Sequence, residues 1–258
     1  MSASPLALVT GGAHRLGKSF ALTLARLGFD IILHYHSALD EALQTQVEIE
    51  SLKRRVTLAP ADLTQPSEIH ALLSAFHSLD VLVNSAAFMP SGNVDSLSLE
   101  TWNTTLDLNL RAPFLLAQEC AKKMNAGGLI VNITDVGAQK AWSRYPSYTV
   151  SKAALESLTR ILARALAPKI RVNAIAPAQV ATATFKRNML GDPRFNATLR
   201  LRLMAGIPLN RFLEPEEFVG PAVFLCSAAA SAVTGVILPV DGGNLALNAG
   251  GNHIWPTD

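Results

Sequence analysis

The sequence predicts an α/β protein with a doubly wound, mainly parallel sheet and helices on both faces. Short, nearly unbroken apolar runs alternate along the chain with longer segments in which apolar residues recur at helical spacing. Strands that are apolar on both sides are typical of a parallel sheet between two helix layers, joined by right-handed crossovers. The chain has 258 residues and no shift in composition, so we expect one domain over residues 1–258.

The first unit of this pattern is a strand, a tight turn and a helix. The apolar run Leu6–Thr10 leads into a glycine-containing turn, and a helical pattern over Lys18–Leu27 ends at Gly28. Further apolar runs predict strands at Asp30–Tyr35, Arg55–Ala59, Asp80–Asn84, Gly128–Ile133, Ile170–Ile175 and Val236–Val240. The segments between and after them predict helices at Leu39–Leu52, Pro66–His77, Glu100–Met124, Pro146–Ala167 and Glu216–Ala229.

One segment does not fit the alternation. Between Pro177 and Pro208 the pattern is irregular, and the segment is longer than an ordinary connection in a compact domain. We interpret residues 178–208 as a lid over the substrate.

Composition argues against several classes of function. Lys and Arg exceed Asp and Glu by only two, 22 against 20, and no basic run is longer than Lys53–Arg55, so nucleic-acid binding is not expected. The start of the chain lacks the regions of a secretory signal, and the apolar stretch 220–240 is interrupted by prolines and small polar residues. Cys120 and Cys226 lie in apolar helical patterns typical of buried thiols in a reducing compartment. We therefore expect a cytoplasmic protein that binds neither nucleic acid nor membrane and holds no metal.

The first turn is a candidate phosphate-binding site. At the carboxyl end of a parallel strand, a turn that opens a helix offers backbone N–H groups and a helix N-terminus to a pyrophosphate. Gly11 and Gly17 leave room for that approach, although their spacing differs from the usual Gly-x-Gly-x-x-Gly and also fits a plain tight turn.

The end of the second strand bears on the choice of cofactor. A carboxylate there would bind the 2′-hydroxyl of NAD and repel a 2′-phosphate, whereas this chain has His34, Tyr35, His36 and Ser37, with Arg15 in the first turn. Hydrogen-bond donors and a guanidinium without a carboxylate favour NADPH. A metal pair formed by His34 and His36 is an alternative, but no third ligand has an obvious spacing.

Tyr148 and Lys152 are the candidate catalytic pair. They stand four residues apart in a helical pattern, which places them on one face. An ammonium beside a phenol favours the phenolate, and we expect the pair, together with an oxidised nicotinamide, to bring the pKa of the tyrosine nearer to neutrality.

Several motifs together resemble the short-chain dehydrogenase/reductases. They are Thr10-Gly11-x3-Arg15-x-Gly17, Asp62-Leu63, Asn84-Ser85-Ala86-Ala87, Asn109, Tyr148-x3-Lys152, Pro177 and Val240-Asp241-Gly242-Gly243. The resemblance implies a single-domain Rossmann-type sheet of seven parallel strands. It implies that Tyr148 is the acid, that Lys152 holds the nicotinamide ribose and lowers the tyrosine pKa, and that Asn109 supports a proton relay through water. The cofactor contacts that it implies are Gly11, Arg15, Leu16, Gly17, His34, Tyr35, Ser37, Asp62, Leu63, Asn84, Ser85, Ala86, Tyr148, Lys152 and Pro177.

The chain departs from most members of that family at Asp135. The family usually has a serine thirteen residues before the tyrosine, which polarises a substrate carbonyl, and an ionised carboxylate cannot donate to such an oxygen. Asp135, Arg15 in place of the middle glycine, and the Leu33–His36 segment resemble those of pteridine reductases and related dihydromonapterin and dihydrofolate reductases. This resemblance implies an NADPH-dependent reductase of a C=N bond in a pterin, with Arg15, Phe88, Asp135 and Tyr148 contacting the substrate.

Two other functions remain open. In a carbonyl reductase for a ketone or sugar, Thr134 would take the role of the serine, and in a dinucleotide-sensing regulator the site would bind without turnover. Family members are commonly homotetramers that assemble through the helices predicted here at Glu100–Met124 and Pro146–Ala167, and their apolar positions are compatible with that assembly.

Overall fold

The predicted parallel sheet is confirmed. The computed structural model describes residues 4–183, 185–187 and 197–246, and within them seven strands form one sheet in the order β3-β2-β1-β4-β5-β6-β7. Every neighbouring pair is parallel. The strands are β1 Leu6–Val9, β2 Asp30–Tyr35, β3 Val56–Pro60, β4 Leu79–Asn84, β5 Met124–Ile133, β6 Ile170–Pro177 and β7 Ile237–Val240.

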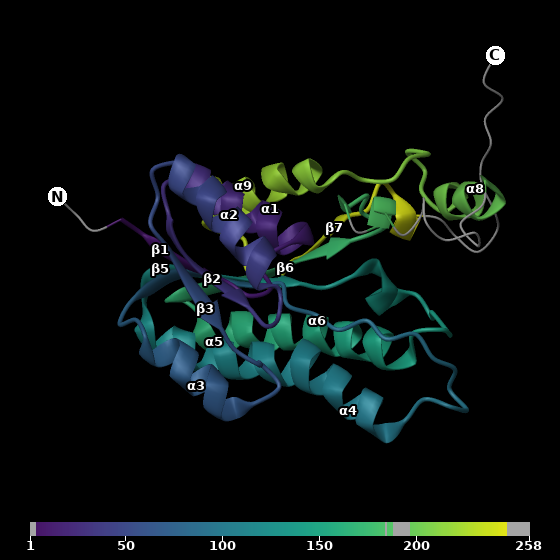
Figure 1. The fold of residues 1–258 in the computed structure, drawn as a ribbon, viewed down its shortest axis with the longest axis horizontal. Coiled ribbons are helices and arrows are strands. Elements are labelled where there is room, and N and C mark those ends of the chain that lie inside the picture. The colour runs from purple at the N-terminus through teal and green to yellow at the C-terminus, as the bar shows by residue number, and fades with distance from the viewer. Residues whose placement is uncertain (1–3, 184, 188–196, 247–258) are drawn as a thin grey trace, which may run out of the picture.

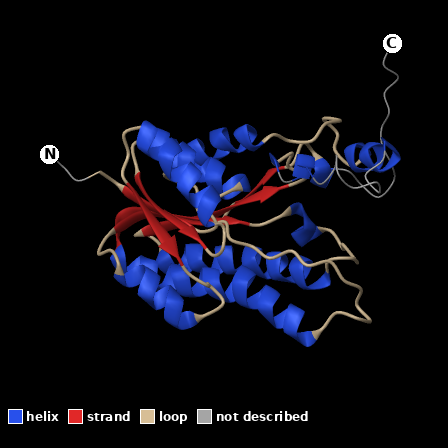
Figure 2. Ribbon diagram, in the orientation of Figure 1, coloured by secondary structure: helices blue, strands red, loops and turns tan. Residues whose placement is uncertain are grey.

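Helices cover both faces of this sheet (Figures 1 and 2). One layer contains α1 Arg15–Arg26, α2 Leu39–Ser51 and α9 Val219–Cys226. The opposite layer contains α3 Pro66–Ser74, α4 Leu99–Leu106, α5 Ala112–Lys123 and α6 Pro146–Leu166. The strand order reverses between β1 and β4, and in a doubly wound sheet that reversal opens a crevice beyond the carboxyl ends of the strands.

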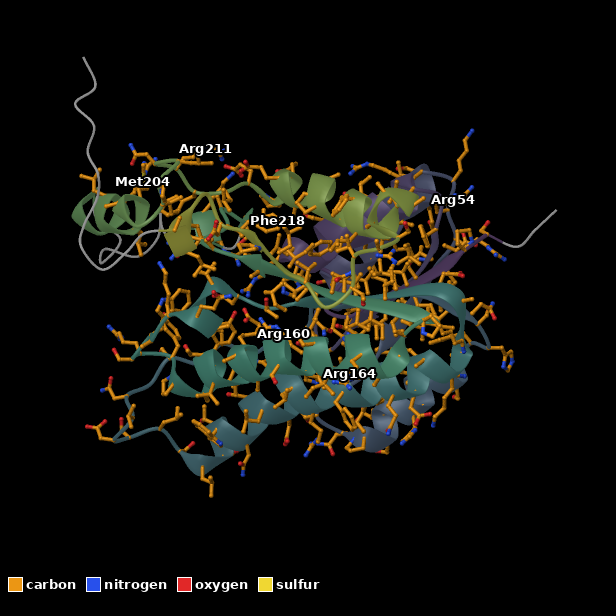
Figure 3. All side chains as sticks on the ribbon, turned by 180° about the vertical axis from the view of Figure 1, so that it is seen from behind. Arg54, Arg160, Arg164, Met204, Arg211 and Phe218 are labelled. Carbon is orange, nitrogen blue, oxygen red and sulfur yellow. The ribbon has the colours of Figure 1, made fainter. Side chains whose placement is uncertain are left out.

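The strands alternate between two cores, which explains why they are apolar on both sides. Ala7 and Val9 pack toward α1 and α9, whereas Leu8 between them packs toward α3 and α5. Side chains fill the space on both sides of the sheet, and the fully buried Phe218 belongs to the core on the α1 and α9 side (Figure 3). The central strands are thereby held rigidly, with their carboxyl ends at one edge.

The long helix predicted at Glu100–Met124 is present over residues 99–123, but it is not α-helical throughout. Between α4 and α5 the backbone forms a π-helical segment, Asp107–Arg111. Pro113 has no N–H to donate to the carbonyl of Asn109 four residues earlier, so an unbroken α-helix cannot pass this point without losing a bond. In the π segment the hydrogen-bond spacing widens to five residues, as from the N–H of Ala112 to the carbonyl of Asp107, and Asn109 is completely buried.

The segment that we interpreted as a lid has more structure than its sequence indicates. Within residues 178–208, α8 spans Ala197–Ala205, and the N–H of Ala181 donates to the carbonyl of Leu213 at 2.7 Å. Residues 184 and 188–196 of the predicted lid lie outside the described residues. The helix predicted at Glu216–Ala229 is shorter, because α9 is flanked by short 3₁₀ turns.

The prediction of a buried thiol holds fully for one of the two cysteines. Both are free thiols; Cys120 is buried and Cys226 is half-buried. Burial raises the pKa of Cys120 to about 12 and the pKa of Cys226 to about 11, so both are protonated at neutral pH. Among the described helices, none is both long and apolar enough to span a membrane.

Candidate active site

A cavity of about 610 Å³ lies at the carboxyl edge of the sheet. It collects residues from the ends of β1, β2, β4, β5 and β6, as a doubly wound fold leads one to expect. The predicted site residues that line it are Gly11, Arg15, Leu16, Gly17, His34, Tyr35, Ser37, Asp62, Leu63, Ser85, Ala86, Phe88, Asp135, Tyr148, Lys152 and Pro177. The fold therefore brings together predicted site residues that are far apart in the chain.

The first turn has the close backbone packing that a dinucleotide requires. Gly11 has a positive φ of 62°, and a Cβ there would lie 3.0 Å from the Cα of Ala86. A Cβ on Gly17 would lie 2.0 Å from the carbonyl oxygen of Gly11. In the described structure, His14 precedes α1 without a side-chain capping hydrogen bond, which leaves backbone N–H groups of the first turn for an anion. These residues fit a pyrophosphate.

Thr10 fastens this turn to the end of β4. Its hydroxyl accepts hydrogen bonds from the N–H groups of Ser85 at 2.9 Å and Ala86 at 3.1 Å. The predicted contacts on both sides of the cavity are therefore fixed relative to each other by one buried side chain.

His34 occupies a different role from the one predicted for the strand end. The N–H of Gly11 donates to its Nδ1 at 3.1 Å, and its Nε2 lies 3.0 Å from the carbonyl oxygen of Ala61. Burial, opposed by the bond to Ala61, lowers the pKa of His34 to about 4, so the ring is neutral and Nε2 carries the proton. Both nitrogens thus hold the ends of β1 and β3, and neither is free to bind a phosphate or a metal.

The predicted catalytic pair forms a three-residue cluster with Asp135. The Tyr148 hydroxyl donates to Oδ2 of Asp135 at 2.9 Å, and Gly137 donates its N–H to Oδ1 at 2.7 Å. The Lys152 ammonium donates to the carbonyl of Ile133 at 2.7 Å and lies 5.7 Å from the centre of the Tyr148 ring. The helical spacing of Tyr148 and Lys152 therefore does place both on one face of α6, toward β5.

The electrostatics of this cluster are dominated by burial. Burial raises the pKa of Tyr148 well above 10, and the Asp135 carboxylate raises it further. Burial also raises the pKa of Asp135, although hydrogen bonds from Gly137 and Tyr148 and the charge of Lys152 oppose this. Burial lowers the pKa of Lys152 to about 8, against the attraction of Asp135. The predicted lowering of the tyrosine pKa includes the charge of an oxidised nicotinamide and stays a prediction. Without that charge, a buried phenol beside a carboxylate retains its proton.

Asn109 holds the wall of the cavity. Its Oδ1 accepts from the N–H of Phe88 at 2.8 Å, and its Nδ2 donates to the Phe88 carbonyl at 2.9 Å and to Oγ of Ser151 at 3.0 Å. The side chain of Phe88 is 40% exposed and borders the cavity, where it can contact a ligand. The predicted part of Asn109 in a proton relay stays a prediction, and the hydrogen bonds of its side chain serve to fix Phe88.

Two residues named from the sequence use their side chains for hydrogen bonds within the protein. Asn84, a predicted cofactor contact, is buried and donates to Oδ1 of Asn132 at 2.8 Å. Thr134 borders the cavity, but its hydroxyl donates to the carbonyl of Ile175 at 3.2 Å. Thr134 therefore does not offer a substrate carbonyl the donor that the carbonyl-reductase hypothesis gave it.

Sequence reasoning missed part of the lining. Thr104 and Leu108 reach the cavity from α4 and the π segment, and Val180 and Thr182 reach it from the beginning of the predicted lid. The spacing of four between Thr104 and Leu108, directly before Asn109, was an available signal.

Comparison with known proteins decides the family. A family model described as enoyl-(acyl carrier protein) reductase matches residues 11–244. The chain is 34% identical over 249 residues to a 2-dehydro-3-deoxy-D-gluconate 5-dehydrogenase of Escherichia coli (strain K12), covering 93% of this chain and 95% of the relative. The chain belongs to the short-chain dehydrogenase/reductase family.

Solved structures agree with this membership. The angucycline C-6 ketoreductase LanV with bound NADP has a TM-score of 0.85 and 27% identity, and 94% of this chain and 96% of that chain are covered. A blue fluorescent protein from a metagenomic library, in complex with NADPH, has a TM-score of 0.85 and 31% identity, with 93% and 97% covered. This short-chain oxidoreductase is therefore similar to a sugar-acid dehydrogenase and a ketoreductase, and its predicted kinship with pteridine reductases is not supported.

Proposed function

We propose that this protein is an NADPH-dependent carbonyl reductase, which interconverts a ketone and a secondary alcohol. The observation that carries the proposal is the protonated Tyr148, held in the cavity wall by Asp135 with Lys152 beside its ring. A buried phenol that keeps its proton is suited to donate it to an oxygen that becomes negatively charged. The similarity to a sugar-acid dehydrogenase and to a ketoreductase favours a carbonyl as the group that is reduced.

Tyr148, Asp135 and Lys152 have different roles in the proposed reduction. The nicotinamide, when bound, supplies the hydride to the carbonyl carbon. Tyr148 gives a proton to the carbonyl oxygen. Burial raises the pKa of Asp135 and so favours its protonated form. In that form it can stand in for the usual serine, because a carboxylic acid donates one hydrogen bond while an oxygen can still accept from Tyr148. Lys152, anchored on the Ile133 carbonyl, places a positive charge beside both groups while it is protonated.

The choice of NADPH rests on the cavity lining. Tyr35, His36 and Ser37 line it at the end of β2, where a carboxylate would repel a 2′-phosphate, and Arg15 adds a guanidinium from the first turn. Similar structures are described with bound NADP or NADPH, which supports the same cofactor here.

Arg15 allows a test of cofactor binding that separates strain from contact. Its positive φ of 53° costs a residue with a side chain about 1 kcal/mol. We expect Arg15→Gly to raise the free energy of unfolding by about that amount and to weaken NADPH binding about tenfold, because a charge-assisted contact is lost. Urea denaturation and a fluorescence titration measure the two effects.

Lys53 provides the matched control for Arg15. It is exposed, has a φ of 59° and does not border the described cavity. Lys53→Gly should raise stability to a similar extent without changing the dissociation constant for NADPH. Equal NADPH affinity in wild type and Arg15→Gly would remove Arg15 from the proposed cofactor site.

A substrate panel tests the reaction itself. NADPH oxidation is followed at neutral pH with a keto sugar acid, a small diketone and a polycyclic aromatic ketone, and in parallel with dihydrobiopterin, dihydromonapterin and dihydrofolate. Turnover of at least one ketone with a clear preference for NADPH over NADH is the expected result. Turnover of pterins alone would replace the proposal with C=N reduction, and NADPH binding without any turnover would indicate a dinucleotide-sensing role.

Asp135→Ser distinguishes the two kinds of reduction by its pH dependence. If protonated Asp135 is the donor, wild-type kcat/KM for a ketone should fall as the pH rises through the pKa of Asp135, whereas serine donates at every pH. We expect the ratio of variant to wild-type activity to increase by about tenfold per pH unit above that pKa. A pterin reductase that needs the carboxylate would instead lose activity in the serine variant at all pH values.

A further inference from the structure

Three side chains of α6 form hydrogen bonds with one segment of the chain, residues 133–139. Tyr148, Lys152 and Glu156 are spaced four residues apart, so they share a face of the helix. Tyr148 bonds to Asp135 and Lys152 to the carbonyl of Ile133, as described above. Glu156 continues this row, because its Oε1 and Oε2 lie 3.2 and 3.4 Å from the donating Nε2 of Gln139.

Glu156 is an unusual residue for its position. It is only 5% exposed and does not border the described cavity, so it takes no direct part in binding there. A buried carboxylate costs several kcal/mol unless partners compensate for the lost water. Its partners are the amide of Gln139 and the largely exposed guanidinium of Arg160, 3.7 Å away along α6. The contact with Gln139 therefore links the buried row on α6 to the turn after β5.

That turn connects Gln139 directly to Asp135. Asp135 caps the 3₁₀ turn Val136–Gln139 by accepting the N–H of Gly137, and the N–H of Lys140 closes the turn on the Gly137 carbonyl at 3.2 Å. The ammonium of Lys140 holds the far side by donating to the carbonyl of Asn244 at 2.7 Å. A turn this short has little freedom to move at one end only, so holding Gln139 restrains the carboxylate of Asp135.

We propose that Glu156 is a positioning residue, which fixes Asp135 against Tyr148 by holding Gln139. The proposal rests on the proposed function only in so far as Asp135 takes part in the reduction. Tyr148 and Lys152 of α6 are the titratable groups that act on Asp135, and Glu156 acts through the backbone turn.

The kinetic test compares variants of Glu156 with a variant of its exposed partner Arg160. Glu156→Ala should lower kcat about tenfold, since misplacing a reacting group by a fraction of an ångström has effects of this order, and should change the KM for NADPH by less than twofold. Glu156→Gln keeps an acceptor for Gln139 and should restore kcat to within about twofold of wild type. Arg160→Ala removes only the exposed ion pair and should leave kcat unchanged.

The pH profile separates positioning from a general loss of stability. Burial raises the pKa of Asp135 by more than the hydrogen bonds from Gly137 and Tyr148 lower it. A loosened turn admits water and weakens these bonds together, so the net effect is to lower that pKa toward its usual range. The decline of kcat/KM with rising pH should therefore begin at a lower pH in Glu156→Ala than in wild type or Arg160→Ala. An unchanged profile, or equal losses in Glu156→Ala and Arg160→Ala, would overturn the positioning role.

A measurement without turnover keeps this test independent of the substrate. The carboxyl ¹³C resonance of Asp135 is assigned with Asp135→Asn. It should titrate at a lower pH in Glu156→Ala than in wild type, and at the wild-type pH in Arg160→Ala. If no ketone is reduced, the proposed function fails while this titration still decides the role of Glu156. Should Glu156→Ala not fold, Gln139→Ala removes the same contact from an exposed residue and should shift the resonance in the same direction; an unchanged titration in the folded variant would overturn the proposal.

Discussion

Replacing Tyr148 by phenylalanine should lower kcat about 10³-fold while NADPH still binds with an affinity within twofold of wild type. The phenol is the group placed to donate a proton in the cavity, and a positioned acid contributes about 10²–10⁴ in rate. The ring fills the same volume without the hydroxyl, so the packing of α6 against β5 is retained. Stopped-flow reduction at saturating ketone and a fluorescence titration with NADPH measure the two quantities.

The loss of the hydroxyl also has an electrostatic consequence for its neighbour. The bond from Tyr148 lowers the pKa of Asp135, so the carboxyl in Tyr148→Phe should titrate at a higher pH than in wild type. The matched control is Tyr145→Phe, because Tyr145 packs edge-on against Trp142 at 6.2 Å and lies outside the described cavity. Wild-type kcat in Tyr148→Phe, or a comparable loss in Tyr145→Phe, would contradict the assignment of the acid.

Sequence reasoning went furthest where a single period determines the structure. The alternation of Ala7, Leu8 and Val9 between two cores follows from the pleat of a strand, and that burial on both sides was visible as an unbroken apolar run. The π segment was not visible in the same way, since apolar spacing continues through it and only Pro113 marks the break. Periodicity reports which face is buried and is insensitive to one extra residue in the helical ladder.

In the site, too, contacts set by helical spacing could be predicted from the sequence, whereas contacts between distant segments could not. Tyr148 and Lys152 meet because of helical spacing, which the sequence contains. The sequence does not determine the tyrosine pKa in the free protein, because that pKa depends on burial and on Asp135, which approaches only when β5 and α6 pack together. The hydrogen bonds of His34 and Thr134 likewise go to neighbouring strands or turns, so the roles of these side chains required the sheet.

Replacing Lys152 by methionine should lower kcat/KM about 10²-fold and remove a pH dependence that wild type shows near pH 8. Burial lowers the pKa of Lys152 to about 8, so wild type loses this positive charge, and with it activity, as the pH rises through that value. Methionine fills a similar volume without titrating. In an Asp135→Ser background, which lacks the carboxyl titration, one decline should remain, at a pH below 8 because the charge of Asp135 no longer raises the pKa of Lys152. Lys152→Met should remove this decline.

The same shift determines how stability depends on pH. The pKa of Lys152 is about 8 in the folded protein against an ordinary value of 10.5, so between these values the unfolded chain binds more protons and the free energy of unfolding rises with pH. Relative to Lys152→Met, wild type should gain up to about 3 kcal/mol from pH 8 to 10.5. Lys122→Met, at an exposed lysine paired with Glu119, is the control and should follow wild type. If the free energy of unfolding depends on pH in the same way in wild type and Lys152→Met, the Lys152 ammonium is not desolvated. The lowered pKa of Lys152, on which the electrostatic account of the Asp135–Tyr148–Lys152 cluster depends, would then be wrong.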